Sequence, residues 1–331
     1  MSESIRIAVT FHVDEAGLDR IRSVDPRIEL LDLAEISGRT PPVGEIRERL
    51  LAEVARAEVM LGPNRIPIEY FDRAIDLKWF QSINAGVERL DRDGLLRRGF
   101  TVTTASGLAA GPIAEYVIGT MVMLAKGLQL SVRHQLERRW EFRFTGELAG
   151  KTLGIVGLGE IGRETARRAR PFGMRIIASR RRVTGEANHP DCDELIPQSQ
   201  LHRLLSESDY VVLSVPLTSD TARLIGPAEF ATMKSSACLI NIARGEVIDQ
   251  SALIEALRSG KIAGAALDVT DPEPLPPDNP FWAMENVILT PHVSGAVEGY
   301  GSRAVEFFVP NLERYLRGET LAHVASADLG Y

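Results

Sequence analysis

The chain has 331 residues, of which 44% are hydrophobic and 25% charged, and its formal net charge is −7. This length suits about two domains of ~150 residues each, and the acidic balance argues against general binding of nucleic acid or of anionic membranes. The N-terminus has no secretory signal pattern and the two cysteines lie in unlike contexts, so we expect a cytoplasmic protein without a metal site.

Short apolar runs alternate with amphipathic stretches over the first hundred residues. Strands are predicted at IRIAVTF, EVMLG, KWFQSI and FTVTT, and helices at EIRERLLAEVARA and IEYFDRAI, where apolar residues recur every three or four positions. Alternating strands and helices indicate a parallel, doubly wound sheet. The apolar stretch of residues 113–127 is shorter than the ~20 residues of a membrane-spanning helix. We expect it to form a buried helix that connects two domains.

A second series of strands begins at Lys151. Near-continuous apolar runs occur in TLGIVGLG, RIIASR, YVVLSVP, ACLINIA, IAGAALDV and NVILTPH, as is typical of parallel strands covered on both faces. Helical patterns separate most of these runs, and a last amphipathic stretch, residues 298–319, follows the final one. Pro310 interrupts that stretch, which predicts a kink or a break in the helix.

A glycine-rich turn joins the first strand of this series to a helix. Its three glycines are spaced as G-x-G-x-x-G: the first permits a tight turn, the second lets a pyrophosphate approach the backbone, and the third lets helix and strand pack closely. The free N–H groups at the start of the helix favour phosphate. The turn therefore predicts a dinucleotide site formed by Gly157, Leu158, Gly159, Glu160, Ile161 and Gly162.

The motif lies in the middle of the chain, whereas a lone Rossmann domain carries it near its start. We therefore predict an α/β protein with two doubly wound parallel-sheet domains. Residues 106–296 form the Rossmann nucleotide-binding domain. Residues 1–105 and 297–331 form a discontinuous, flavodoxin-like catalytic domain, to which the C-terminal helix returns.

The position that contacts the adenine ribose, about 20 residues beyond the turn, usually carries an acidic residue. Here the sequence has Ser179, Arg180 and Arg181, followed by Arg182. A carboxylate would accept hydrogen bonds from the ribose hydroxyls of NAD, whereas a hydroxyl and guanidinium groups suit the 2′-phosphate of NADP. We predict that the cofactor is NADP; a basic loop over an NAD site is the alternative.

Three polar residues lie at the ends of three different strands in the second series. Arg244 follows ACLINIA, Asp268 ends IAGAALDV and His292 ends NVILTPH, while Glu273 lies in a proline-rich loop between the last two. Ligands of open α/β sheets bind at the carboxyl ends of the strands. An arginine there can hold a carboxylate, and a histidine can transfer a proton. Taken singly, a surface salt bridge and a surface or packing histidine remain the alternatives.

Three long segments, residues 147–174, 214–269 and 273–292, resemble in this order the D-isomer-specific 2-hydroxyacid dehydrogenases, including the glyoxylate/hydroxypyruvate reductases. The resemblance implies that Arg244 binds the carboxylate and keto oxygen of the substrate. It implies that His292 protonates this oxygen, that Glu273 stabilises the imidazolium, and that Asp268 contacts the nicotinamide carboxamide. The cofactor would also contact Arg244 and His292 and the strand-end residues Val215, Pro216, Thr221, Ile242 and Ala243.

In the first domain, SINAGVERL resembles the substrate loop of the same family. The resemblance implies that the backbone N–H groups of Ala85, Gly86 and Val87 face the substrate carboxylate. The family often has Asp where Glu88 stands, a mild departure. Arg65, after an early strand, is a further candidate for substrate binding, with a surface arginine as the equal alternative.

The resemblance implies NADPH-dependent reduction of a small 2-keto acid, such as glyoxylate or hydroxypyruvate, to a D-2-hydroxy acid, with substrate bound between the domains. An NAD-dependent relative acting on another acid, such as phosphoglycerate, is one alternative. A nucleotide-sensing binding protein of the corepressor type is the other. The family also implies a homodimer, in which we expect Trp140 to anchor the interface rather than reach the site of the neighbouring subunit.

Overall fold

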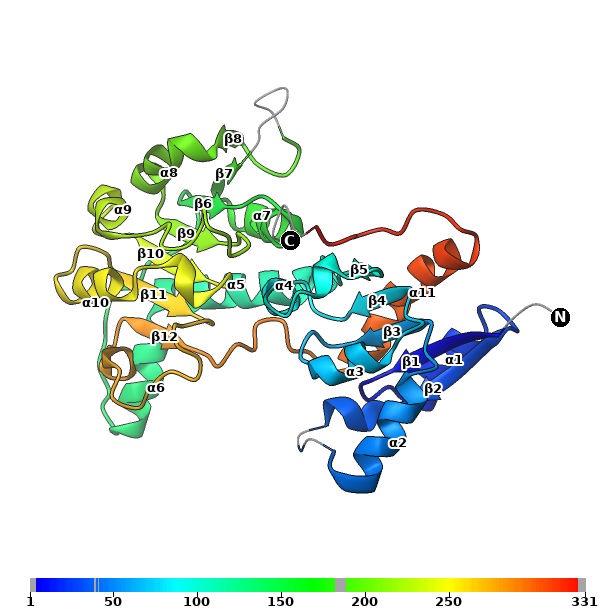
Figure 1. Ribbon diagram of the computed structural model, residues 1–331. Coiled ribbons are helices and arrows are strands. Elements are labelled where there is room, and N and C mark those ends of the chain that lie inside the picture. The colour runs from blue at the N-terminus through cyan, green and yellow to red at the C-terminus, as the bar shows by residue number, and fades with distance from the viewer. Residues whose placement is uncertain (1–3, 39, 41, 182–188, 327–331) are drawn as a thin grey trace. The chain divides into compact units, whose positions relative to one another are not determined.

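The computed structural model describes residues 4–38, 40, 42–181 and 189–326. Contacts divide the chain into two compact units, Met1–Leu108 with Val297–Tyr331 and Ala109–Ala296 (Figure 1). The first boundary lies three residues beyond position 105, where the sequence pattern placed it.

The first unit contains a five-stranded parallel sheet in the order β2-β1-β3-β4-β5, which is the flavodoxin-like order. Its described strands are β1 (Ile5–Val9), β2 (Ile28–Asp32), β3 (Val59–Gly62), β4 (Trp79–Ser82) and β5 (Thr101–Thr103). The helices between them, and the one returning from the C-terminal part, are α1 (Glu15–Arg22), α2 (Gly44–Val54), α3 (Ile68–Arg73), α4 (Glu88–Arg92) and α11 (Tyr300–Leu316). Separate apolar clusters cover the two faces of the sheet, as a doubly wound sheet requires.

Helix α11 continues through Pro310, so of the kink or break predicted there the break is wrong. Pro310 is exposed, and its ring therefore meets solvent rather than the core. The opposite side of α11 buries Val305, Phe308 and Leu312, and the Phe308 ring stacks on Trp79 with centroids 5.0 Å apart. This packing offsets the backbone hydrogen bond that a proline removes from a helix.

The second unit contains a seven-stranded parallel sheet in the order β12-β11-β10-β9-β6-β7-β8. Its described strands are β6 (Thr152–Val156), β7 (Arg175–Arg180), β8 (Glu194–Pro197), β9 (Tyr210–Leu213), β10 (Cys238–Asn241), β11 (Gly264–Leu267) and β12 (Val287–Leu289). The strand order reverses between β6 and β9, so ligand is expected at the carboxyl ends of these two strands. Both sheets have the predicted arrangement, and the predicted fold class is confirmed.

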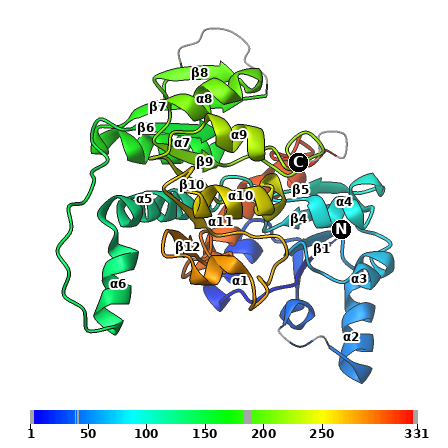
Figure 2. The same ribbon diagram turned by 90° about the vertical axis from the view of Figure 1, so that its left-hand side faces the viewer.

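Helices cover both faces of the second sheet. They are α5 (Ala110–Lys126), α6 (Leu128–Leu136), α7 (Glu160–Ala169), α8 (Leu201–Glu207), α9 (Pro227–Thr232) and α10 (Gln250–Arg258). Helix α5 packs along α7, and beyond α6 the chain runs without regular secondary structure to β6 (Figure 2). Within the described residues, no single helix has the length and apolar composition to cross a membrane; only α5 and α6 taken together, bent by 67°, have them.

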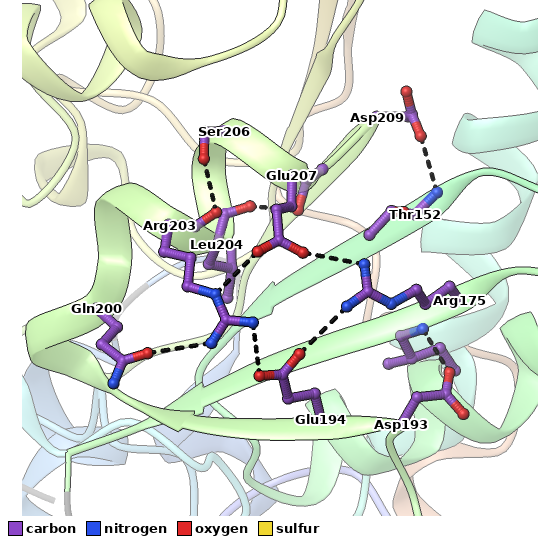
Figure 3. A network of polar contacts seen from close by, with 12 residues as sticks. Thr152, Arg175, Asp193, Glu194, Gln200, Arg203, Leu204, Ser206, Glu207 and Asp209 are labelled. Carbon is purple, nitrogen blue, oxygen red and sulfur yellow. Dashed lines mark hydrogen bonds and ion pairs between the residues drawn. The ribbon is translucent and has the colours of Figure 1, made fainter.

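A network of ion pairs joins β7, β8 and α8 at the edge of this sheet (Figure 3). Glu207 accepts from Arg175 Nη1 and from Arg203 Nε, both at 2.9 Å. Glu194 binds the same two guanidinium groups, at 3.2 Å and 2.7 Å. Hydrogen bonds from Arg175 and Arg203 lower the pKa of Glu207.

We expect Glu207→Gln to destabilise the second unit by less than about 1 kcal/mol, because all four side chains are partly exposed. A carboxyl whose pKa is lowered in the folded state stabilises that state above its unfolded pKa, and this contribution is lost as the pH falls. The difference in Tm between the variant and the wild type should therefore shrink in acid and in high salt. Thermal melts measure this difference, and Glu255→Gln, which changes an exposed side chain on α10, is the control. If the Tm values of the two variants depended on pH and salt in the same way, the expectation would be contradicted.

Candidate active site

The glycine turn follows β6 and has the geometry that a bound pyrophosphate requires. Gly157 has φ of +100°, and a Cβ there would lie 2.7 Å from the carbonyl oxygen of Ser214. A Cβ on Gly162 would lie 2.3 Å from the carbonyl oxygen of Gly157. At Gly159, by contrast, a Cβ would meet no atom within 4 Å, so this side of the turn is open. Gly159 caps α7 without a side-chain hydrogen bond, which leaves N–H groups at the start of α7 for phosphate.

The end of β7 lies directly beside this turn. The carbonyl oxygen of Ser179 accepts hydrogen bonds from the N–H groups of Gly157 and Leu158, both at 3.1 Å. The Ser179 side chain is buried, whereas Arg180 and Arg181 are exposed. Arg180 and Arg181 are therefore the exposed residues where the sequence predicts contact with the ribose, and Arg182 lies outside the described residues.

The loop after β9 borders the turn from the other side. The Thr221 hydroxyl donates to the Pro216 carbonyl oxygen at 2.6 Å and accepts from the Thr218 N–H at 2.8 Å. These bonds use the hydroxyl of Thr221 to fix the loop, while the Pro216 side chain is exposed. Val215 is half-buried and adjoins the side of Gly157 on which a Cβ would clash.

Arg244 follows β10 in a turn that the side chain of Asn241 fixes. Asn241 Oδ1 accepts from the Ala243 N–H at 3.0 Å, and Asn241 Nδ2 donates to the Arg244 carbonyl at 2.9 Å. Arg244 Nη1 donates to the Ala243 carbonyl at 2.7 Å, which orients the guanidinium. The next residue must be glycine, because a Cβ on Gly245 would lie 2.1 Å from the Thr270 carbonyl carbon. This close approach brings the Arg244 turn against the loop that carries Glu273.

His292 and Glu273 form a hydrogen-bonded pair between the loops after β12 and β11. His292 Nδ1 lies 3.0 Å from Glu273 Oε2, and the Thr270 N–H donates to the other carboxylate oxygen at 3.2 Å. The side chains of His292 and Glu273 are 51% and 40% exposed, so the imidazole remains open to a ligand. The pairing at Nδ1 leaves Nε2 as the ring nitrogen that faces away from the carboxylate.

Asp268 is almost completely buried and holds the backbone around His292. Its carboxylate accepts hydrogen bonds from the N–H groups of Val293 and Ser294 at 2.9 and 3.0 Å, and its carbonyl accepts from the His292 N–H at 2.8 Å. His292 has φ of +55°, a left-handed conformation that is uncommon outside glycine. The predicted contact of Asp268 with the carboxamide remains a prediction, and its anchoring role was not foreseen.

The loop after β4 in the first unit presents backbone donors. The Asn84 side chain accepts from the Asn64 N–H at 2.9 Å, and Asn64 Nδ2 donates to the Gly86 carbonyl at 3.2 Å. Within the described residues, the N–H groups of Ala85, Gly86 and Val87 have no hydrogen-bond acceptor. These donors can bind an anion such as a carboxylate. Arg65, on the neighbouring loop after β3, is exposed.

Residues 118–294 match the model of the NAD-binding domain of D-isomer specific 2-hydroxyacid dehydrogenases. A glyoxylate reductase of Korarchaeum cryptofilum is 36% identical, with 95% of this chain and 93% of that protein covered. A D-3-phosphoglycerate dehydrogenase of Methanocaldococcus jannaschii is 34% identical, and the match covers 89% of this chain but 56% of that protein. A crystal structure of a D-isomer specific 2-hydroxyacid dehydrogenase from Xanthobacter autotrophicus, in complex with NADPH and MES, is 26% identical with a TM-score of 0.80, covering 99% of this chain and all of that one.

The chain belongs to the D-isomer-specific 2-hydroxyacid dehydrogenase family. It is an NAD(P)-dependent oxidoreductase that acts on a CH–OH group. The family and the enzyme class predicted from the sequence are therefore confirmed.

Two side chains of this dehydrogenase site were missed by the sequence reasoning. Thr290 donates to Asp268 Oδ1 at 2.6 Å, and Tyr116 on α5 lies 2.8 Å from the Thr290 hydroxyl. Thr290 stands two residues before His292 at the end of a predicted strand, which is a signal that could have found it. No comparable signal marks Tyr116, which is 174 positions away in the sequence.

Proposed function

We propose that this dehydrogenase uses NADPH to reduce a small 2-keto acid, of the glyoxylate or hydroxypyruvate class, to a D-2-hydroxy acid. The His292–Glu273 pair beside the Arg244 turn is the observation that carries the proposal, because it supplies a proton donor and a carboxylate-binding group together. A relative with this activity in its name, a glyoxylate reductase, matches nearly the whole chain.

The role proposed for each side chain follows from the negative charge that forms on the substrate during reduction. The bound cofactor supplies a hydride to the C2 carbon of the keto acid. Negative charge then develops on the keto oxygen, where the Arg244 guanidinium stabilises it and His292 Nε2 donates a proton. The Glu273 carboxylate stabilises the imidazolium before this transfer. Arg244 also binds the substrate carboxylate, for which the first unit offers the backbone donors of Ala85, Gly86 and Val87 and the side chain of Arg65.

The preference for NADPH rests on the exposed pair Arg180 and Arg181 at the end of β7. Nothing acidic stands at this position to accept the ribose hydroxyls of NAD or to repel a 2′-phosphate. The related structure from Xanthobacter autotrophicus holds NADPH, which supports the same choice.

A panel of keto acids tests the proposal. Purified protein is mixed with glyoxylate, hydroxypyruvate, pyruvate or a phosphorylated keto acid, each with NADPH and with NADH, and cofactor absorbance is followed. We expect the highest kcat/KM with NADPH and one of the two-carbon or three-carbon unphosphorylated acids. Preference for the phosphorylated acid with NADH would support the second candidate function, an NAD-dependent dehydrogenase of a phosphoglycerate-like acid. The similarity to a D-3-phosphoglycerate dehydrogenase suggests this alternative. Cofactor binding without turnover of any acid would instead indicate a binding protein.

We also propose a homodimer formed through the segment between α6 and β6. Trp140, Phe142 and Phe144 are exposed by 101%, 80% and 94%, at alternating positions. Arg143, between them, donates to the Gly127 carbonyl and to the Ser131 hydroxyl and so attaches the segment to the start of α6. The Arg143 side chain is directed to α6 while the three aromatic side chains are exposed, and the Phe142 and Phe144 rings contact each other with centroids 5.3 Å apart.

We propose that a second copy of the chain binds the surface formed by Trp140, Phe142 and Phe144. Aromatic side chains bury roughly 150–250 Å² each, so three from each of two copies approach about 1,000 Å², the lower limit for a stable interface. We expect the wild type to sediment as a dimer and a variant with all three aromatics changed to Ala as a monomer that still binds cofactor. The control changes Val43 and Ile75, exposed apolar residues of the first unit, to Ala. A monomeric wild type would contradict the proposal.

A further inference from the structure

A chain of three polar groups connects helix α5 to the loop of His292. The Tyr116 hydroxyl lies 2.8 Å from Thr290 Oγ1, which lies 2.6 Å from Asp268 Oδ1. Tyr116 comes from the middle of α5, Thr290 directly follows β12, and Asp268 directly follows β11. All three belong to the second unit.

Asp268, the last of the three groups, fixes the direction of both hydrogen bonds. A carboxylate oxygen can only accept, so the single hydroxyl hydrogen of Thr290 points to Asp268. Thr290 Oγ1 must then accept from Tyr116, whose hydroxyl is the donor. Burial raises the pKa of Tyr116 to about 12, so this donor keeps its proton throughout the working range of the enzyme.

The Asp268 carboxylate, which accepts the Thr290 hydrogen bond, also fixes the backbone around His292. Asp268 Oδ1 accepts from Thr290 and from the Val293 N–H, and Oδ2 accepts from the Ser294 N–H. The Asp268 carbonyl accepts from the His292 N–H. These bonds hold His292 at a positive φ, a conformation that persists only where its surroundings enforce it.

We propose that Thr290 and Tyr116 are positioning residues for the proton transfer by His292. The Thr290 hydroxyl prevents rotation of the Asp268 carboxylate and thereby keeps the backbone of residues 292–294 in place, and Tyr116 fixes the Thr290 hydroxyl. Neither side chain touches the reacting atoms. The inference rests on the proposed function, in which His292 is the proton donor.

The same contacts have a competing explanation: Thr290 and Tyr116 serve only to provide hydrogen bonds to a buried carboxylate. Asp268 is 1% exposed, and a buried carboxylate needs donors whatever its role. That explanation predicts a loss of stability with kcat intact, whereas positioning predicts a loss of kcat at a temperature where the protein is folded. The two explanations therefore differ in a measurable quantity.

The test compares Thr290→Val, which keeps the shape and removes the hydroxyl, with Thr290→Ser, which restores it. We expect Thr290→Val to lower kcat by about 10- to 100-fold, since a displaced catalytic group costs a reaction about this much. The dissociation constant of NADPH should change less than about threefold, because the glycine turn and Arg180 remain. Thr290→Ser should recover most of kcat. Tyr116→Phe should lower kcat less, and should add nothing to Thr290→Val in the double variant, because both act through one hydroxyl.

Two controls separate the possible failures. Thr120→Val removes another buried hydroxyl from α5, one that donates to the Val117 carbonyl at 3.0 Å, and should leave kcat unchanged. His292→Ala, measured in the same assay, reports on the proposed function itself. An inactive His292→Ala with wild-type kcat in folded Thr290→Val would overturn the positioning role alone. If Thr290→Val does not fold, Tyr116→Phe decides, and wild-type kcat in that variant overturns the inference.

Discussion

Replacing His292 with Ala should lower kcat for keto-acid reduction by about 10²–10⁴-fold, because the variant lacks the imidazole, paired with Glu273, that we propose donates the proton to the keto oxygen. Arg244→Ala should cause a loss of similar size, divided between kcat and the KM of the keto acid, since the guanidinium binds both ground state and transition state. The measurement is steady-state kinetics at saturating NADPH. Both variants should bind NADPH and melt close to the wild-type temperature.

A matched change in the partner of His292 sharpens this expectation. Glu273→Gln keeps a side chain that can accept from His292 Nδ1 but removes the negative charge that stabilises the imidazolium. We expect an intermediate loss of kcat, because the Gln side chain keeps the hydrogen bond that orients the imidazole but lacks the charge that stabilises the imidazolium. Wild-type rates in either His292→Ala or Arg244→Ala would show that the site lies elsewhere.

Replacing Arg180 with Asp should reverse the cofactor preference. The change removes a guanidinium that can bind the 2′-phosphate and introduces a carboxylate that repels it and accepts the ribose hydroxyls. A charge-assisted hydrogen bond contributes about 1.5–3 kcal/mol, so the KM for NADPH should rise by about 10- to 100-fold. The KM for NADH should stay the same or fall. Turnover at saturating cofactor should change little, because β7 lies apart from the loops of Arg244 and His292.

Arg258→Asp provides the control for this variant. Arg258 lies in the last turn of α10 in the same unit and is exposed, so the substitution changes the net charge equally without reaching the ribose position. It should leave both KM values near the wild type. A wild-type enzyme that already prefers NADH, or an equal rise in both KM values on Arg180→Asp, would contradict the role of Arg180.

The sequence revealed the interior strands of both sheets and the edge strands β5 and β12. Interior strands such as β6 and β10 are buried along their whole length and were predicted from their near-continuous apolar pattern. Two edge strands were missed: β2 is only partly buried along its length, and β8 is four residues long and contains Glu194 and Pro197. An edge strand meets solvent on one side, so its sequence lacks the continuous apolar signal.

The candidate site was predictable where it follows from chain order. Arg244, Asp268 and His292 each follow a recognisable strand, and parallel strands bring their carboxyl ends to one edge. What the sequence could not show is how a residue is held. The contact of Tyr116 with Thr290 joins a helix to a strand end, and the close approach of Gly245 to Thr270 joins two loops. Such contacts depend on packing distances that spacing along the chain does not encode.

The discontinuity of the first unit has a consequence for synthesis on the ribosome. All strands of the second unit have been translated by residue 296, whereas α11, whose Phe308 stacks on Trp79, is translated only afterwards. The N-terminal sheet is therefore made first, and the part of its apolar face that α11 covers stays exposed until residues 300–316 have been translated. During this interval the nascent first unit is the part of the chain that most needs protection by chaperones.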